Sequence, residues 1–238
     1  MRLGLFDLPA PLLQWIDNRL TTFIPAPVTV AIWAVIGAIL CLELYRIVSP
    51  QRRIGEIKQQ AKAAQEKLGN YDGEFEGAWP LMKDMLGLSL KRVAIVFPAT
   101  LIAAYPVIVL LVWLSNHYGH HFPAPDEDVA VEASPLLARW VPGDPPRIQA
   151  MQPDGQTVLD RPLTAAVPVI HKRAWWNWLI ANPAGYLPAD APVDEIRIDL
   201  RDREFFAKGP GWLRGWEAIF ITVLTIAALI YKSARKID

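Results

Sequence analysis

The sequence predicts a membrane α-helical bundle of three transmembrane helices, with a cytoplasmic helical hairpin and a small periplasmic β-rich domain. Three apolar stretches, residues 27–48, 93–114 and 213–232, each match the roughly 20 residues that cross the hydrocarbon core of a bilayer. A charged stretch with helical periodicity separates the first two stretches. Short alternating runs with turn residues between them separate the last two.

The composition excludes several classes of protein. The 238 residues suffice for three spans and one soluble domain of about 90 residues. Lys plus Arg and Asp plus Glu are equal at 24 each, so the net charge says nothing about a nucleic-acid partner, and we expect none. Cys41 is the one cysteine, which leaves it without a partner for an intrachain disulfide. Pro9 and Pro11 interrupt the short apolar run after Arg2, so no cleavable signal peptide is predicted.

The distribution of charge predicts the orientation, because cytoplasmic loops carry an excess of Lys and Arg. Residues 49–92 are rich in basic side chains, and the tail 233–238 is basic, whereas residues 115–212 are rich in Asp and Glu. We therefore expect a multi-pass protein of the bacterial inner (plasma) membrane, with the N-terminus and the large loop in the periplasm and the C-terminus in the cytoplasm. The basic residues behind this expectation are Arg46, Arg52, Arg53, Lys58, Lys62, Lys67, Lys83, Lys91 and Arg92, then Lys232, Arg235 and Lys236.

The N-terminal segment, residues 1–26, predicts an amphipathic helix. Apolar residues recur at helical spacing from Leu12 to Ile24, with Gln14 and Asp17 expected on the opposite, polar side. Such a helix suits the outer membrane interface, with Trp15 at headgroup depth. Packing against the periplasmic domain is the alternative.

Two ionisable residues, Glu43 and Arg46, lie one helical turn apart near the inner end of the first span. Ionisable groups at such a depth either snorkel to the interface or line a polar cavity. Arg46 is expected to snorkel. For Glu43, which is shorter and deeper, both interpretations stay open.

Residues 49–92 predict an antiparallel coiled-coil hairpin. Its first helix carries apolar residues at seam spacing, the turn follows at residues 69–73, and the second helix starts just before Pro80 and continues into the second span. Met82 and Met85 either form part of the seam or offer an adaptable surface to apolar segments of other proteins. The seam residues are Ile54, Ile57, Ala61, Ala64 and Leu68.

The residues after the second span offer no recognised catalytic or metal motif. His117, His120 and His121 are close in sequence, but no acidic or thiol ligand stands at a recognised spacing, so neither a metal nor another cofactor is predicted. The domain at 115–212 contains no nucleophile motif and no phosphate-binding loop, so we expect no enzyme. A membrane-bound enzyme that uses the histidines is a third hypothesis.

The same domain is predicted to be a small antiparallel β structure. Turns such as residues 153–155 separate its alternating runs. Trp175, Trp176 and Trp178 are candidates for a docking surface, and membrane-interface or core packing is the usual alternative for such aromatics. The predicted strands are 129–133, 147–151, 156–159, 165–170 and 193–200.

The arrangement of a span, a charged hairpin, a returning span and a third span resembles the three-helix core of the YidC-like membrane protein insertase superfamily. It is most similar to the minimal branch, which comprises archaeal YidC-like proteins and the insertase subunit of the endoplasmic reticulum membrane complex. The resemblance covers about residues 28–114 and 216–231. It rests on the exit Ser49-Pro50-Gln51 from the first span, the heptad at 54–68 and the helix with the Met pair.

This resemblance implies a groove, open to the cytoplasm and the inner leaflet, through which a polar segment of a client crosses the membrane. The client-groove candidates are Glu43, Arg46, Arg92, Met82 and Met85. The first hypothesis is thus a non-enzymatic, chaperone-like insertion or assembly factor, with membrane lipids and client membrane proteins as partners. The alternative is a structural or accessory subunit of a larger hetero-oligomeric membrane complex, docked through its periplasmic domain.

Overall fold

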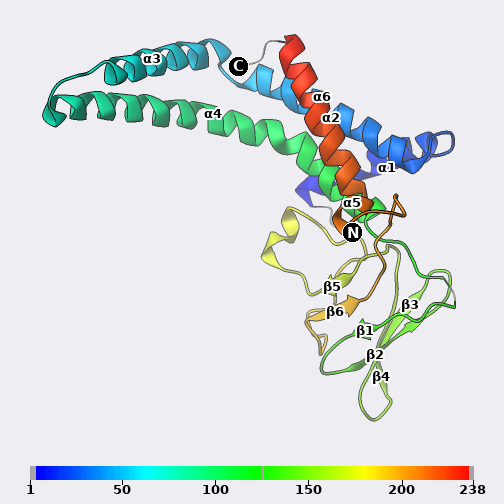
Figure 1. Ribbon diagram of the computed structural model, residues 1–238. Coiled ribbons are helices and arrows are strands. Elements are labelled where there is room, and N and C mark those ends of the chain that lie inside the picture. Colours follow the sequence, from blue (N-terminus) through cyan, green and yellow to red (C-terminus); the bar gives the residue numbers. More distant parts are fainter. Residues whose placement is uncertain (1–3, 125, 236–238) are drawn as a thin grey trace. The chain divides into compact units, whose positions relative to one another are not determined.

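The computed structural model describes residues 4–124 and 126–235, so Lys236 of the predicted basic tail lies outside the described residues. The chain divides into two compact units. The first unit contains the described residues up to Ile32 together with Ile108–Ile221. The second unit contains Trp33–Val107 and the described residues from Thr222 onward. Figure 1 shows the succession of helices and strands along the chain.

Three helices are long and apolar enough to cross a membrane, as predicted. They are α2 (Ala26–Val48), α4 (Phe75–Tyr118) and α6 (Trp216–Arg235). The second hairpin helix and the second span are one continuous helix of 44 residues. α6 begins at Trp216 rather than at residue 213, because extended backbone at Gly215 separates it from the short helix α5 (Gly211–Arg214).

Helix α4 contains three prolines, Pro80, Pro98 and Pro106. The sequence suggested that Pro80 lies near the first turn of this helix. The helix begins at Phe75, so Pro80 lies in its second turn. A proline inside a helix removes one backbone donor. Pro98 and Pro106 fall in the apolar part of α4, where spanning helices tolerate such interruptions.

The second unit contains the predicted hairpin. Helix α3 (Gln51–Gly69) runs antiparallel to the first half of α4 in Figure 1. The less exposed positions of α3 coincide with the predicted seam, and Ile54 and Ile57 are only 2% and 3% exposed. The seam spacing therefore identified the packed face of this helix correctly.

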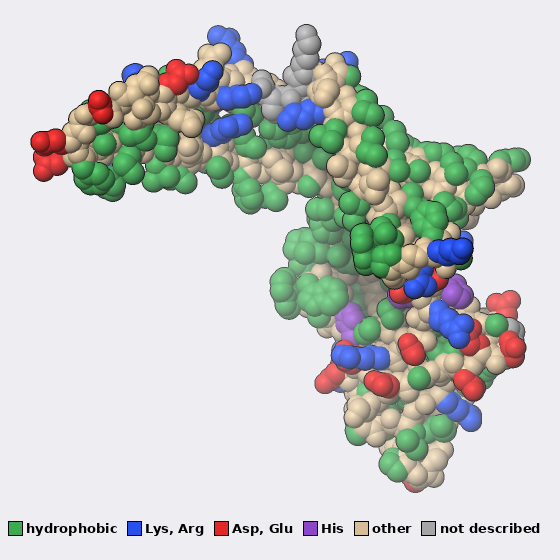
Figure 2. Space-filling model, viewed as in Figure 1, with side chains coloured by type: hydrophobic (Ala, Val, Ile, Leu, Met, Phe, Trp, Pro, Cys, Tyr) green, Lys and Arg blue, Asp and Glu red, His purple; other side chains and the backbone are tan. Residues whose placement is uncertain are grey.

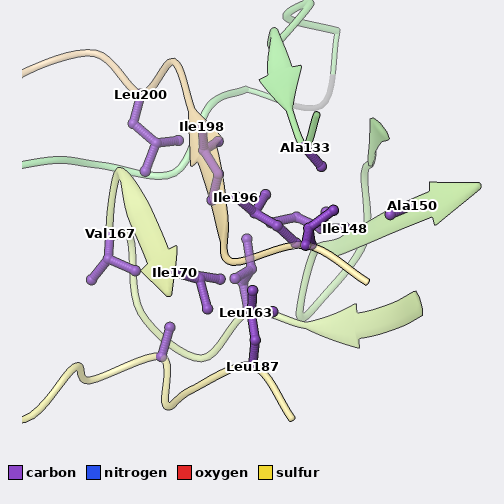
Figure 3. Close-up of a cluster of buried hydrophobic side chains, with 12 residues drawn as sticks. Ala133, Ile148, Ala150, Leu163, Val167, Ile170, Leu187, Ile196, Ile198 and Leu200 are labelled. Carbon is purple, nitrogen blue, oxygen red and sulfur yellow. The ribbon is translucent and has the colours of Figure 1, made fainter. Parts of the chain in front are cut away.

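The first unit begins with the 3₁₀ turn η1 (Leu5–Asp7) and helix α1 (Ala10–Leu20), and it contains the predicted antiparallel β structure. Two three-stranded sheets have the orders β1-β6-β5 and β2-β3-β4. Ile148, Leu163, Ile170 and Ile196 are fully buried between them in the apolar core that Figure 3 shows. The strands are β1 (Val131–Glu132), β2 (Leu137–Val141), β3 (Arg147–Met151), β4 (Thr157–Pro162), β5 (Val169–His171) and β6 (Glu195–Ile198).

One strand was absent from the prediction. β2 pairs with β3 from Leu137↔Met151 to Val141↔Arg147. Its side chains do not alternate cleanly, because Leu137 stands exposed on the same side as the polar Arg139. Period-2 patterning is the main strand signal, and here an outward-facing leucine obscures it.

The polarity expected for α1 is wrong at one position. Asp17 is fully buried, although the helical pattern assigned it to the polar side. By contrast Leu8, Leu12 and Trp15 are exposed. The buried carboxylate has specific partners in this unit, described below, and a hydropathy pattern contains no information about such partners.

Candidate functional site

A hollow of about 390 Å³ lies in the second unit where three helical segments meet. Tyr45 of α2 and Ile54 of α3 form one part of its lining, and α4 provides the rest. The hydroxyl groups of Ser89 and Thr100 donate to carbonyls of their own helix. The lining is therefore mainly apolar, and Arg92 is the one charged residue among the described residues that form it. The α4 residues of the lining are Ser89, Arg92, Val93, Val96, Phe97 and Thr100.

An exposed apolar stripe extends along α4 from this hollow. Its residues recur at spacings of three and four, which places them on one face of the helix. Every one of them is between 38% and 70% exposed. Val93 and Phe97 belong to both the stripe and the hollow. The α4 stripe consists of Phe75, Trp79, Met82, Leu86, Leu90, Val93, Phe97 and Leu101.

The stripe continues past the charged residues that end the apolar span. Lys91 and Arg92 stand at this boundary, so the part from Phe75 to Leu90 belongs to the hairpin. Figure 2 shows apolar side chains along α4, and charged side chains among other polar ones along α3. Lys83 contacts the face of Trp79 at 5.2 Å from the ring centroid and borders the stripe.

The Met pair is divided between two faces of α4. Met82 belongs to the stripe, whereas Met85 is half-buried. Ala78, Leu81 and Leu88 are half-buried at the matching helical spacing, so Met85 lies on the seam-facing side. Met85 thus fits the interpretation as a seam residue, and Met82 fits the interpretation as part of an adaptable exposed surface.

Glu43 and Arg46 do not line the hollow. Glu43 accepts hydrogen bonds from the Tyr231 hydroxyl at 2.5 Å and from Nε of Arg235 at 3.2 Å. Arg46 pairs with the other carboxylate oxygen at 2.7 Å. The Glu43 carboxylate thus lies between the guanidinium groups of Arg46 and Arg235 and links α2 to α6. Of the predicted charged groove residues, Arg92 is the one that lines the hollow.

The first unit contains a buried polar cluster around Asp17. The carboxylate of Asp17 accepts a hydrogen bond from the Tyr118 hydroxyl at 2.8 Å, and Nε2 of His117 lies 3.2 Å from the same oxygen. His117 stacks on Trp113 with 5.3 Å between ring centroids. This cluster joins α1 to the end of α4, and nothing in the periodicity of either segment indicates the pairing.

The predicted histidine cluster is dispersed. His117 faces Asp17, Nδ1 of His120 lies 3.2 Å from Asp202, and His121 is exposed. Within residues 4–124 and 126–235, no group of three or more His, Cys, Asp or Glu side chains is placed to hold a metal ion.

The tryptophans at 175–178 occupy the 3₁₀ turn η2 (Trp175–Trp178). Trp175 is 81% exposed, Trp178 is 56% exposed, and Trp176 lies beside His171. Asn177 is buried; its side chain accepts from the backbone N–H of Ala174 and donates to the carbonyl of Ile180. The inward Asn177 leaves the indole rings pointing outward, so core packing does not explain them.

Comparison with known proteins yields no match to a family model, to a curated protein or to a solved structure. The functional argument therefore rests on the geometry of the chain itself.

Proposed function

We propose that this protein is a non-enzymatic factor for insertion or assembly of other membrane proteins, similar in action to the YidC-like superfamily. An apolar client segment would bind along the α4 stripe and pass into the hollow at Arg92. The observation that carries this proposal is the unbroken course of the stripe from the hairpin into the hollow.

The exposed apolar side chains of the hairpin need a partner. Contiguous apolar patches on a protein surface in water mark interaction sites, because their burial is favourable. From Phe75 to Leu101 the stripe is about 39 Å long at 1.5 Å per residue. A membrane-spanning helix of about 20 residues is roughly 30 Å long, so it fits within this length.

The hollow offers a polar contact for the part of a client that must cross the membrane. Moving an unsatisfied polar group into hydrocarbon costs several kcal/mol. The guanidinium of Arg92 donates hydrogen bonds without accepting any, so it suits carbonyl groups and carboxylates of a client flank. Glu43 and Arg46 would act differently, by holding α2 against α6 beside the hollow.

The proposed orientation places the hairpin in the cytoplasm of a bacterium. Arg46 and Arg235 contact the same carboxylate, so the basic ends of α2 and α6 lie at one membrane face. The hairpin joins α2 to α4 at that face, and an excess of basic residues favours the cytoplasmic side. The acidic side chains of residues 115–212 support a periplasmic location for the β structure. The contact of Asp17 with Tyr118 supports the same side for the N-terminal segment.

The first test is crosslinking along the stripe. A photoreactive phenylalanine analogue replaces Leu86 on the stripe or, as control, Gln59 on the exposed face of α3. We expect crosslinks from position 86 to many newly made membrane proteins and few from position 59. One stoichiometric partner at position 86 would instead favour the accessory-subunit alternative.

The second test measures insertion. In cells without other insertases, Leu86→Glu combined with Leu90→Glu should reduce insertion of small, short-tailed membrane proteins several-fold. Gln59→Glu combined with Gln60→Glu adds the same charge on the polar face and should have no effect. Normal insertion with the stripe variant, at wild-type protein amounts, would refute the proposal.

A further inference from the structure

The exposed tryptophans of the first unit belong to a larger surface. The N-terminal segment packs against the residues that follow η2: the N–H of Phe6 donates to the carbonyl of Leu179 at 2.9 Å. The N–H of Ala181 donates to the carboxylate of Asp7 at 2.6 Å. Gly4 lies so close that an added Cβ would stand 2.5 Å from the Leu179 carbonyl oxygen.

Apolar side chains of this N-terminal segment are exposed beside the turn. Leu5, Leu8, Leu12 and Trp15 recur at spacings of three and four, and Trp15 is 61% exposed. Figure 2 shows apolar side chains gathered over the turn that is yellow in Figure 1. We name this set the outer aromatic surface: Leu5, Leu8, Leu12, Trp15, Trp175, Trp176 and Trp178.

The depth of this surface follows from its neighbours in the same unit. Trp176 and Asn177 line a hollow together with Asn116, which lies two residues before the end of α4. A second hollow places Trp113 and Asn116 beside Ala181. α4 is long and apolar enough to cross a membrane, and a span that ends with the helix would leave the hydrocarbon at these last turns. In that arrangement the turn would lie at the level of the lipid headgroups.

We propose that the outer aromatic surface inserts into the headgroup region of the outer leaflet and holds the β domain against the bilayer. Indole rings combine an apolar body with an N–H donor, and they concentrate at this depth in membrane proteins. A bilayer that α4 spans would meet this surface without a further partner, and the choice of the outer leaflet rests on the proposed orientation. This inference does not depend on the client-binding role.

Two further features fit a lipid surface. Basic side chains border the aromatics: Arg173 is exposed two residues before Trp175, and the Arg19 guanidinium lies 6.0 Å from the centroid of Trp15. Lipid phosphates are their complement. In addition, the hydrogen bonds of Asn177 fix the turn in advance, so no ordering accompanies insertion.

The test uses the full-length chain in proteoliposomes of phosphatidylethanolamine and phosphatidylglycerol, with Cys41→Ser as background. Spin labels are attached after Trp175→Cys, after Trp178→Cys, or after Leu137→Cys as control, an exposed apolar site on β2. Collision rates are measured with oxygen, which concentrates in lipid, and with a nickel chelate, which stays in water.

We expect the oxygen-to-nickel ratio at positions 175 and 178 to exceed that at position 137 several-fold. Equal ratios at the three positions would overturn the inference, because the turn would then face water in a bilayer that contains no other protein. That outcome would instead make the surface a docking site for a partner protein.

A second measurement uses the intrinsic fluorescence of the protein and needs no attached label. Lipids brominated near the headgroup quench indole fluorescence on contact, and Trp175→Phe combined with Trp178→Phe removes two rings while retaining aromatic bodies. We expect the quenched fraction of the total fluorescence to fall in this variant. An unchanged or larger quenched fraction would contradict the inference, because it would mean that the two rings do not contact lipid.

Discussion

The buried contact between Asp17 and Tyr118 allows a quantitative test of the first unit. Tyr118→Phe removes the hydroxyl that donates to the Asp17 carboxylate at 2.8 Å and preserves the ring. Both side chains are almost fully buried, so water does not replace the lost donor. A hydrogen bond to a charged group contributes about 1.5–3 kcal/mol. We therefore expect a loss of that size in the free energy of unfolding.

The matched control is Tyr186→Phe, the same chemical change elsewhere in the first unit. The Tyr186 hydroxyl accepts from the backbone N–H of Asn182 at 3.1 Å, and both groups are neutral. A neutral hydrogen bond contributes only about 0.5–1.5 kcal/mol. Tyr118→Phe should thus cost about 1 kcal/mol more than Tyr186→Phe.

Reversible unfolding by SDS in mixed micelles measures both free energies, and thermal melting provides a check. In a chain of this size, each kcal/mol lowers the melting temperature by about 2–4 °C. If Tyr118→Phe costs no more free energy than Tyr186→Phe, the hydrogen bond from Tyr118 to the Asp17 carboxylate does not stabilise the contact between α1 and α4, and the reasoning is wrong.

Three further predictions concern single positions. Burial raises the pKa of Asp7, so its folded state binds a proton more readily than its unfolded state, and stability falls as pH rises through and above the ordinary aspartate range. The Asp7→Asn variant should therefore have the melting temperature of the wild type in acid and a higher melting temperature at pH 7. The same difference from the wild type at both pH values would contradict the raised pKa of Asp7. Gly185 has φ +77°, and an added Cβ would lie 2.6 Å from the Arg161 guanidinium, so Gly185→Ala should lower the melting temperature, whereas Gly155→Ala, where φ is +88° and the space is open, should lower it less. Ile57→Ala should cost about 2–5 kcal/mol in the hairpin, measured as faster hydrogen exchange across 51–69, and exchange at the wild-type rate would show that the seam does not stabilise α3.

Much of the architecture could be predicted because its signals are local. The length of an apolar run predicts a span, and the spacing of Ile54 and Ile57 predicts the packed face of α3, since both follow from helix geometry. The antiparallel character of the β region follows from short runs and turns, although β2 was missed because Leu137 faces outward. The α4 stripe was also visible in principle, because its residues keep one spacing across the boundary at Lys91.

The candidate sites depended more on distant partners. The sequence left the environment of Glu43 open, and its partner Tyr231 lies 188 residues later in the chain. The helical spacing of its apolar neighbours assigned Asp17 to the polar side, whereas its buried partner Tyr118 lies 101 residues away in the chain.

The sequence by itself determined that this chain has three apolar helices, a helical hairpin and a small β structure, because length and periodicity are properties of neighbouring residues. Only the tertiary structure decided which charged groups are paired, that Arg92 lines the hollow, and that the tryptophans at 175–178 face outward. The physical reason is that the environment of a polar or aromatic side chain is set by the segments that pack around it, and its own stretch of sequence does not specify them.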